Sequence, residues 1–329
     1  MQKAGCLFIA IAFLMVVTKT IAAAAPLKKV VYAPQWLLQA QFAGYIMAKE
    51  KGFYEKRGLD VTILRGGPKA SSLELLEKGK AQFATFPLTT GIVKREQGIA
   101  LVNIAQILQK SGLMFIARKS SGISEPRDMM HRKVGIWDDT NLQLEARAFF
   151  RRHGLSVEMI PQSETMNLFL RGCVDVASAT YYNEYDVLIN TGLDRDDLTT
   201  FFFADYGIGF PQDGLYTLEK TFTSDNGALC RDFVAASLEG WRYAFANKKE
   251  TIHDLIIIMR QHQIPASPVH QEWMLRHIED LVMYGREAVG KLSYDDYMKT
   301  AQCLQNEKII KHIPPWSAFY KDLTAHEKK

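Results

Sequence analysis

Short apolar runs alternate with helical patterns along much of the chain, and this alternation limits the fold more than any other sequence feature. The first series reads strand, helix, strand, helix, strand, helix, followed by two further strands. Its segments are 30–33, 39–51, 59–64, 71–78, 82–85, 89–97, 99–108 and 113–118. In the helix expected over 39–51, Phe42 and Ile46 have the i, i+4 spacing of one helix face. The order predicts an α/β fold with a doubly wound sheet.

The same order begins again near residue 133, which predicts a second sheet. Its segments are strand 133–137, a helix to 153 opened by a capping box at 140–143, strand 157–161, helix 165–171, strand 174–179, helix 184–189 and strand 199–204. The stretch 214–218 leads back, and beyond Asn226 the pattern is nearly all helical. We therefore expect lobe 1 over 26–118 and 205–329, with C-terminal helices, and lobe 2 over 119–204. A crevice between two such lobes is the default binding site.

The N-terminus has the three-part layout of a secretory signal peptide. Lys3 precedes an apolar stretch at 7–17, and the small residues at 22–25 offer a cleavage site. The stretch is short for a membrane span, although an uncleaved anchor is the alternative. We predict a signal peptide over 1–25 and a periplasmic mature protein.

Charge and cysteine content exclude several classes of protein. The net charge is +4 and falls to +2 when Lys3 and Lys19 are removed with the signal peptide, so we expect no nucleic-acid partner. Removal of the signal peptide also removes Cys6 and leaves three cysteines, an odd number. We interpret Cys173, Cys230 and Cys303 as buried small side chains. We expect a monomer.

Polar and aromatic residues follow the ends of the predicted strands, where open parallel sheets bind ligands. Flat rings can stack on a planar ligand, while amides and carboxylates pair with groups on its edge. The candidate ligand-binding residues are Gln35, Trp36, Gln41, Phe86, Trp137, Asp138, Tyr182, Asn183, Glu184 and Tyr206. Trp36, Trp137 and Tyr206 have an alternative role as core or lobe-packing residues.

Glu184 is the sharpest of these candidates. It falls in the first turn of a predicted helix, where the macrodipole favours an ionised carboxylate. An ionised carboxylate only accepts hydrogen bonds, so it would pair with an amino or amidine-like group. The alternative is that Asn183 and Glu184 simply begin the helix.

The sequence contains no recognisable catalytic or metal-binding set. None of the eight histidines forms an H-E-x-x-H pattern or a zinc spacing with cysteine, and no G-x-S-x-G is present. We predict no catalytic residue, metal or cofactor. The segment 66–72 could hold an anion at a helix start, although a plain turn is the simpler interpretation.

Several segments resemble the solute-binding proteins of ABC importers, in the subgroup similar to thiamine-pyrimidine biosynthesis proteins. They are 41–45 (QFAGY), 51–54 (KGFY), 58–61 (GLDV), 134–137 (VGIW), 169–175 (FLRGCVD), 182–185 (YNEY), 205–207 (DYG) and 210–214 (FPQDG). The resemblance covers about 28–221 well and the helical tail loosely. It implies the two-lobed type II periplasmic-binding-protein fold, which closes on a small molecule.

The resemblance also implies a ligand and a partner. Members of the pyrimidine-precursor branch bind an aminopyrimidine between aromatic rings, in agreement with the candidates Trp36, Tyr182, Asn183 and Glu184. The partner would be an ABC permease, or a membrane sensor in the alternative. Other members take up sulfonates, so a sulfonate-type anion also stays open. Related fungal pyrimidine synthases carry a Cys-rich motif that this chain lacks, so an enzyme is less expected.

Overall fold

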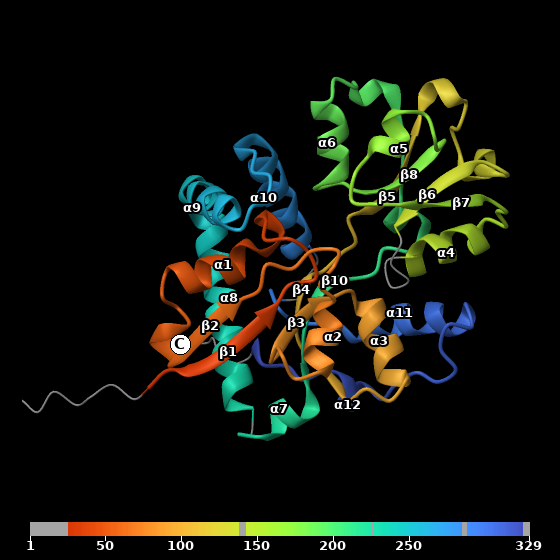
Figure 1. Ribbon diagram of the computed structural model, residues 1–329. Helices are drawn as coiled ribbons and strands as arrows, with labels where there is room; N and C mark the ends of the chain where they lie inside the picture. Colours follow the sequence, from red (N-terminus) through yellow and green to blue (C-terminus); the bar gives the residue numbers. More distant parts are fainter. Residues whose placement is uncertain (1–25, 138–142, 226, 285–287, 325–329) are drawn as a thin grey trace, which may run out of the picture.

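The computed structural model describes residues 26–137, 143–225, 227–284 and 288–324 and contains two separate five-stranded sheets (Figure 1). The predicted signal peptide and most of the predicted capping box lie outside these residues. We call the first sheet with α1–α3 and α7–α12 the first lobe, and the second sheet with α4–α6 the second lobe. The prediction of two sheets flanked by helices, with a helical C-terminal region, is confirmed.

The first sheet is mixed, with β10 antiparallel to both of its neighbours. Its strands in spatial order are β2 (Leu59–Ile63), β1 (Lys28–Ala33), β3 (Phe83–Phe86), β10 (Gln212–Leu218) and β4 (Leu101–Leu108). The three strands β2, β1 and β3 run parallel, so their carboxyl ends meet at one edge.

The second sheet repeats this plan, with β5 as its antiparallel strand. Its strands in spatial order are β7 (Glu158–Gln162), β6 (Lys133–Trp137), β8 (Val176–Thr180), β5 (Leu113–Arg118) and β9 (Leu198–Phe202). The sequence analysis put 113–118 in the first lobe, which is wrong. Strand β5 pairs along its length with β8 and β9, and an apolar run does not itself reveal which sheet a strand joins.

Twelve α-helices lie in the described part of the chain. They are α1 (Ala43–Glu50), α2 (Ser72–Glu77), α3 (Leu88–Glu96), α4 (Gln143–Arg152), α5 (Asn167–Leu170), α6 (Glu184–Asn190), α7 (Glu219–Thr223), α8 (Ala228–Ala246), α9 (Lys248–Gln261), α10 (Pro268–Val282), α11 (Tyr294–Asn306) and α12 (Trp316–Phe319). Short 3₁₀ turns include η1 (Ala40–Phe42), η5 (Arg195–Asp197) and η6 (Phe203–Tyr206). None of the described helices is both long enough and apolar enough to span a bilayer.

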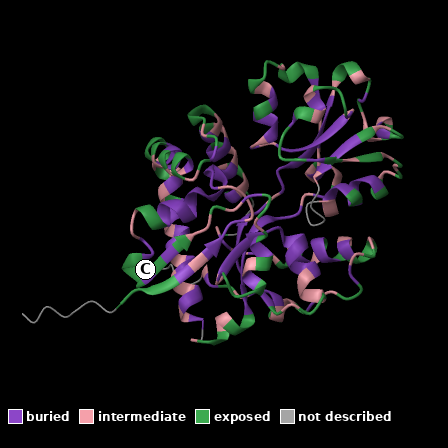
Figure 2. Cartoon of the chain, viewed as in Figure 1, coloured by how far each residue is buried: buried purple, intermediate pink, exposed green. Residues whose placement is uncertain are grey.

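Each sheet is covered by helices on both faces, and its central strands are buried between them (Figure 2). On β5, Phe115 and Ala117 join one core cluster, whereas Met114 and Ile116 join the cluster on the other face. This two-residue alternation is the geometry of a strand buried on both sides.

Close packing of α1 on α8 fixes the segment that leads into the site. A Cβ on Gly44 would lie 2.1 Å from the Trp241 ring, so only glycine allows this approach. Helix α1 directly continues η1, which carries Gln41, so the contact anchors Gln41.

The cysteines differ from one another in exposure. All three are free thiols, with Cys230 buried, Cys303 partly buried and Cys173 exposed. The expectation that all three are buried is therefore wrong for Cys173, which follows the turn at Gly172 after α5.

Candidate ligand-binding site

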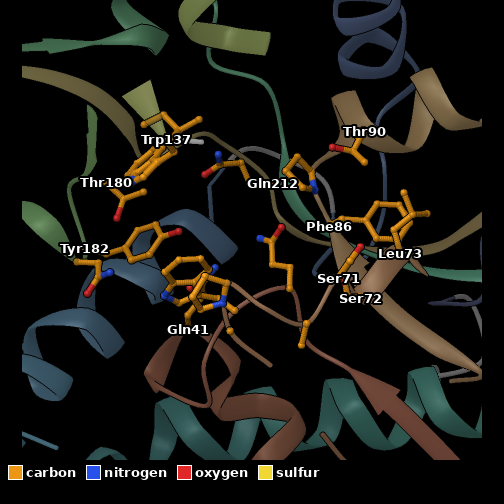
Figure 3. A pocket seen from close by; sticks show the side chains of 18 of the residues that line it. Gln41, Ser71, Ser72, Leu73, Phe86, Thr90, Trp137, Thr180, Tyr182 and Gln212 are labelled. Carbon is orange, nitrogen blue, oxygen red and sulfur yellow. The ribbon is translucent and has the colours of Figure 1, made fainter. Parts of the chain in front are cut away.

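A cavity lies between the two lobes and encloses about 990 Å³ of space, part of it open to solvent. Eight predicted site residues line it: Gln35, Trp36, Gln41, Phe86, Trp137, Tyr182, Asn183 and Glu184. Eleven residues outside the predicted set also line it: Gly67, Pro68, Ala70, Ser71, Ser72, Leu73, Pro87, Thr90, Leu113, Thr180 and Gln212. Figure 3 shows Trp137, Thr180 and Tyr182 on one side and Ser71, Leu73, Phe86 and Thr90 on the other.

The first-lobe wall includes two glutamines that are both hydrogen-bonded to one buried carboxyl group. Gln35 follows β1 and donates its Nε2–H to Asp213 Oδ1. Gln41 lies in η1 and donates its Nε2–H to Asp213 Oδ2 at 2.8 Å. Gln39 Nε2 donates in turn to Gln41 Oε1 at 3.1 Å. Both amides are therefore oriented by hydrogen bonds from behind the wall.

Asp213 itself does not line the cavity. It lies in β10 with only 2% of its surface exposed, and its φ of 51° is in the left-handed region. Burial raises the pKa of the Asp213 carboxyl to about 7, against the opposing effect of the Gln41 and Gln35 hydrogen bonds. The carboxyl is a buried acid whose neighbours on this wall are uncharged amides.

The second-lobe wall presents a carboxylate directly. Glu184 is the first residue of α6, and its side chain turns back to the end of β8. Thr180 donates to Oε2 from its backbone N–H at 2.8 Å and from Oγ1 at 2.7 Å, and Asn183 Nδ2 donates to Oε1 at 2.7 Å. Each carboxylate oxygen offers about two acceptor directions, so Oε1 retains capacity for a ligand donor.

Burial changes the expected electrostatics of Glu184. Desolvation raises its pKa, and the hydrogen bonds from Thr180 and Asn183 only partly oppose that rise. The sequence analysis expects the helix start to favour the ionised carboxylate. Desolvation, which is the largest effect on the pKa of Glu184, acts in the opposite direction. Glu184 is the only charged side chain among the cavity-lining residues in the described part of the chain.

Helix α10 of the first lobe supports this second wall from outside the cavity. His270 Nδ1 lies 2.7 Å from Asp186 Oδ2, and its Nε2 lies 2.9 Å from Asn183 Oδ1. Since Asn183 uses Nδ2 to donate to Glu184, its Oδ1 accepts from His270. The sequence analysis found no role for His270, because it is 87 residues from Asn183 along the chain.

The aromatic residues differ in how much of each ring the protein already covers. Phe86 stacks on Tyr216 with 4.0 Å between ring centroids, so one face is occupied. Tyr182 is 5% exposed, whereas Trp36 and Trp137 are half-buried and pack only in part against the cores of their lobes. By this criterion Trp36 and Trp137 are the better candidates for stacking.

Two predicted site residues are not among the residues that line this cavity. Tyr206 lies at the end of η6, where its ring meets Phe149 and His153 edge-on, each with 5.1 Å between centroids. Tyr206 lies outside the cavity lining because β9 is the edge strand of its sheet, and the chain beyond it folds onto α4. Asp138 lies outside the described residues.

The segment 66–72 approaches the cavity, but its hydroxyl groups are already used. Ser71 Oγ accepts from Glu74 N–H as the cap of α2, and Ser72 Oγ donates to Thr85 O at 3.0 Å. Gly66 has a φ of 66°, and a Cβ there would lie 2.0 Å from Trp36 O. These contacts make the segment a tight structural turn beside Trp36.

The main contributors that the sequence analysis missed are Thr90, Thr180 and Gln212. Thr90 is 2% exposed, and its hydroxyl has no hydrogen-bond partner in the described part of the chain. Gln212 begins β10, whose antiparallel direction brings its start to the cavity. No three His, Cys, Asp or Glu side chains gather as a metal site within the described ranges.

Comparison with known proteins gives a family and a set of relatives. Residues 39–251 match a family described as "NMT1/THI5 like". The formylaminopyrimidine-binding protein of Halalkalibacterium halodurans is 22% identical, over 70% of this chain and 70% of that protein. The riboflavin-binding protein RibY of Chloroflexus aurantiacus is 24% identical over 68% of this chain, which spans 64% of RibY.

A shorter match and a structural neighbour complete the comparison. The 4-amino-5-hydroxymethyl-2-methylpyrimidine phosphate synthase of Legionella pneumophila is 23% identical over 30% of this chain and 32% of that enzyme. The periplasmic aliphatic sulphonate binding protein SsuA of Escherichia coli superposes with a TM-score of 0.68 at 14% identity, over 92% of this chain and 94% of SsuA. At that identity the likeness shows the fold alone, which is that of periplasmic binding proteins.

Proposed function

This chain belongs to the NMT1/THI5-like family, and on that premise we propose that it is an extracytoplasmic solute-binding protein. Its ligand is a small planar nitrogen-containing molecule, similar to the pyrimidine precursors of thiamine. The two lobes hold this ligand between them and deliver it to an ABC permease. The names of the relatives that bind formylaminopyrimidine and riboflavin support this class of ligand.

The observation that carries the proposal is the position of Glu184. Its carboxylate lies in a cavity with half-buried tryptophans and the buried ring of Tyr182, and Oε1 retains an acceptor direction. A carboxylate in this setting favours an amino or amidine-like group, and the rings suit the faces of a heterocycle. We assign ligand contact to Trp36, Trp137, Tyr182 and Glu184, with Gln35 and Gln41 on the facing wall.

The charge of the cavity argues against a sulfonate ligand. No Lys, Arg or His is among the lining residues of the described chain, whereas Glu184 lines it and Asp213 lies behind it. A sulfonate would meet two carboxyl groups without a cation to compensate its charge, which is costly in a desolvated site. A neutral or cationic nitrogen compound avoids that cost.

The test of the ligand class is native mass spectrometry of the gently purified mature protein, followed by calorimetric titration. The probes are 4-amino-5-hydroxymethyl-2-methylpyrimidine and propane-1-sulfonate, a small sulfonate without an amino group. We expect the aminopyrimidine to bind and the sulfonate to give no heat. Tight binding of the sulfonate with no response to the aminopyrimidine would refute the proposed ligand class.

Export and transport are parts of the proposal that need their own measurements. The sequence features at 3–25 support a cleaved signal peptide and a periplasmic location. The mass of the mature protein from a periplasmic extract would reveal the cleavage point, and retention of residues 1–25 would contradict it. Uptake of labelled aminopyrimidine should fall when the permease is deleted; unchanged uptake would favour a sensor role.

We propose binding without turnover. The alternative of a synthase-like enzyme has support from the short match to the pyrimidine phosphate synthase. A binding protein should return the aminopyrimidine chemically unchanged after prolonged incubation. Appearance of a new product in proportion to protein concentration would favour the enzyme.

A further inference from the structure

Asp213 connects both glutamines of the first-lobe wall, although it does not line the cavity itself. Its Oδ1 accepts from Gln35 and its Oδ2 accepts from Gln41. The residue adopts a φ of 51°, a left-handed conformation that is uncommon inside a strand and that Asp takes more readily than most residues.

The hydrogen bonds to Asp213 decide which atoms of the two amides remain free. A glutamine amide has two N–H donors on one nitrogen and one acceptor oxygen, and in both glutamines one N–H is bonded to Asp213, so the nitrogen end of each amide faces Asp213. Gln41 Oε1 is used by Gln39. For Gln35 Oε1 we find no hydrogen-bond partner within the described chain, and Gln35 lines the cavity. The first wall therefore offers the ligand an acceptor.

We propose that Asp213 is a positioning residue that fixes Gln35 with its amide oxygen toward the ligand, so that both walls select N–H donors. This inference rests on the proposed function and narrows its ligand class. The ligand is a heterocycle with N–H donors for both Gln35 and Glu184, as in an amidine or aminopyrimidine. A heterocycle whose amino group is replaced by a carbonyl is rejected.

A carboxylate is needed at position 213 because it accepts from two amides at once. An asparagine has one acceptor oxygen, and its amide nitrogen would face the donor group of a glutamine. One glutamine would then have to turn its amide over, and a turned Gln35 would present a donor to the cavity. Asp213→Asn should therefore change which ligands are preferred, and not only how tightly they bind.

The experiment measures a preference between two probes by calorimetric titration. The first probe is 4-amino-5-hydroxymethyl-2-methylpyrimidine, and the second is 5-hydroxymethyl-2-methylpyrimidin-4-one, which carries an oxo group in place of the amino group. We expect the ratio of affinities, amino over oxo, to fall about tenfold in Asp213→Asn, the effect of one misdirected hydrogen bond. Asp205→Asn, which removes an exposed carboxylate outside the cavity, is the control and should keep the ratio.

A second measurement needs no change at position 213. As the pH falls through about 7, Asp213 gains a proton and must itself donate to one amide, so the ratio of affinities should fall on acidification. The titratable groups that interact electrostatically with Asp213 are Tyr32, Tyr45 and Tyr182, whose pKa values burial raises well above 10, so they stay neutral here. The probe and Glu184 are protonated in the Gln35→Leu variant as well. A pH-dependent change in the affinity ratio that the wild type shows and Gln35→Leu lacks therefore comes from the first-lobe wall.

The outcomes separate this inference from the proposed function. If the wild-type protein binds neither probe, both are overturned. If it binds the amino probe but Asp213→Asn weakens both probes equally, Asp213 is merely structural and only this inference fails. If Asp213→Asn does not fold, the pH profiles decide, and identical profiles for the wild type and Gln35→Leu would overturn the inference.

Discussion

The two walls of the cavity each contain a buried carboxyl group, but they use it differently. In the second lobe Glu184 lines the cavity, and its partners Thr180 and Asn183 leave acceptor capacity for a ligand. In the first lobe Asp213 lies behind Gln35 and Gln41. The two glutamines line the cavity and Asp213 does not. One wall presents a charge and the other presents amides that a charge has oriented.

The walls also differ in where their supports come from. Asp213, Gln35 and Gln41 all belong to the first lobe, so their hydrogen bonds form within one lobe. Asn183 of the second wall is held by His270 of the first lobe, whose helix α10 lies beside α6 in Figure 1. The supports of the first wall therefore lie within one lobe, whereas the second wall has one support from the other lobe.

The largest effect on binding should come from Glu184→Gln. In the wild type Thr180 and Asn183 donate to the two carboxylate oxygens, and the variant would place an N–H₂ group against one of these donors. We expect the affinity for 4-amino-5-hydroxymethyl-2-methylpyrimidine to fall by about 1.5–3 kcal/mol, the range for a charged hydrogen bond, as measured by calorimetry. Glu158→Gln removes an exposed carboxylate from the same sheet and should leave the affinity unchanged. Equal affinities for Glu184→Gln and the wild type would remove the contrast between the walls.

A buried acid at a second contact between the lobes should make stability depend on pH. Glu145 of α4 accepts from Thr89 Oγ1 of α3 at 3.3 Å, and burial raises its pKa to about 7. A raised acid pKa disfavours the ionised native state, so the free energy of unfolding falls as the pH rises from 5 to 8. We expect Glu145→Gln to remove about 2 kcal/mol of that fall, measured by urea unfolding at both pH values.

Asp213 and Glu184, whose pKa values are also raised, should preserve part of the slope in this variant. Glu158→Gln again provides the matched control and should keep the whole pH dependence. If the free energy of unfolding of Glu145→Gln depends on pH as strongly as that of the wild type, the pKa of Glu145 is not raised in the folded protein.

The sequence predicts the fold and much of the cavity for one physical reason. Parallel strands end at a common edge, so residues at or just beyond the carboxyl ends of β1, β3 and β8, and Trp137 at the end of β6, line the cavity. The same rule fails for Gln212, because β10 is antiparallel and brings its first residue to that edge. It fails for Tyr206, because β9 lies at the outer edge of its sheet.

The supports of the walls could not be predicted from local patterns. The sequence analysis includes Asp213 in the segment 210–214 but not among the site residues, since residue type alone does not show which Asp lies behind a cavity wall. His270 lies on a helical stretch, where a histidine is usually solvated or packed, and its partners on α6 are set by tertiary contact alone. Many cavity-lining residues follow from topology, whereas the residues behind them depend on tertiary contacts that the sequence does not show.

Trp137→Ala tests whether the second wall also supplies a stacking ring. The side chain is half-buried and packs in part on the core of its lobe, so we expect the affinity for the aminopyrimidine to fall by about 1 kcal/mol. The melting temperature should change little. Trp316→Ala, which removes a half-buried ring of α12 outside the cavity, should leave the affinity unchanged. A large loss of stability without loss of affinity would make Trp137 a core residue.

The smallest effect should come from His270→Ala, which leaves every lining residue in place. Its loss frees Asn183 and thereby loosens Glu184, so we expect an affinity loss of about 0.5–1 kcal/mol, the net value of one hydrogen bond. The exposed His253 of α9 is the control. The decisive measurement is a double-mutant cycle with Glu184→Gln, since a support that acts through Glu184 has little left to support in that variant. Additive losses of affinity would show that His270 connects the two lobes without positioning Glu184. The two walls would then differ only in whether their carboxyl group lines the cavity or lies behind it.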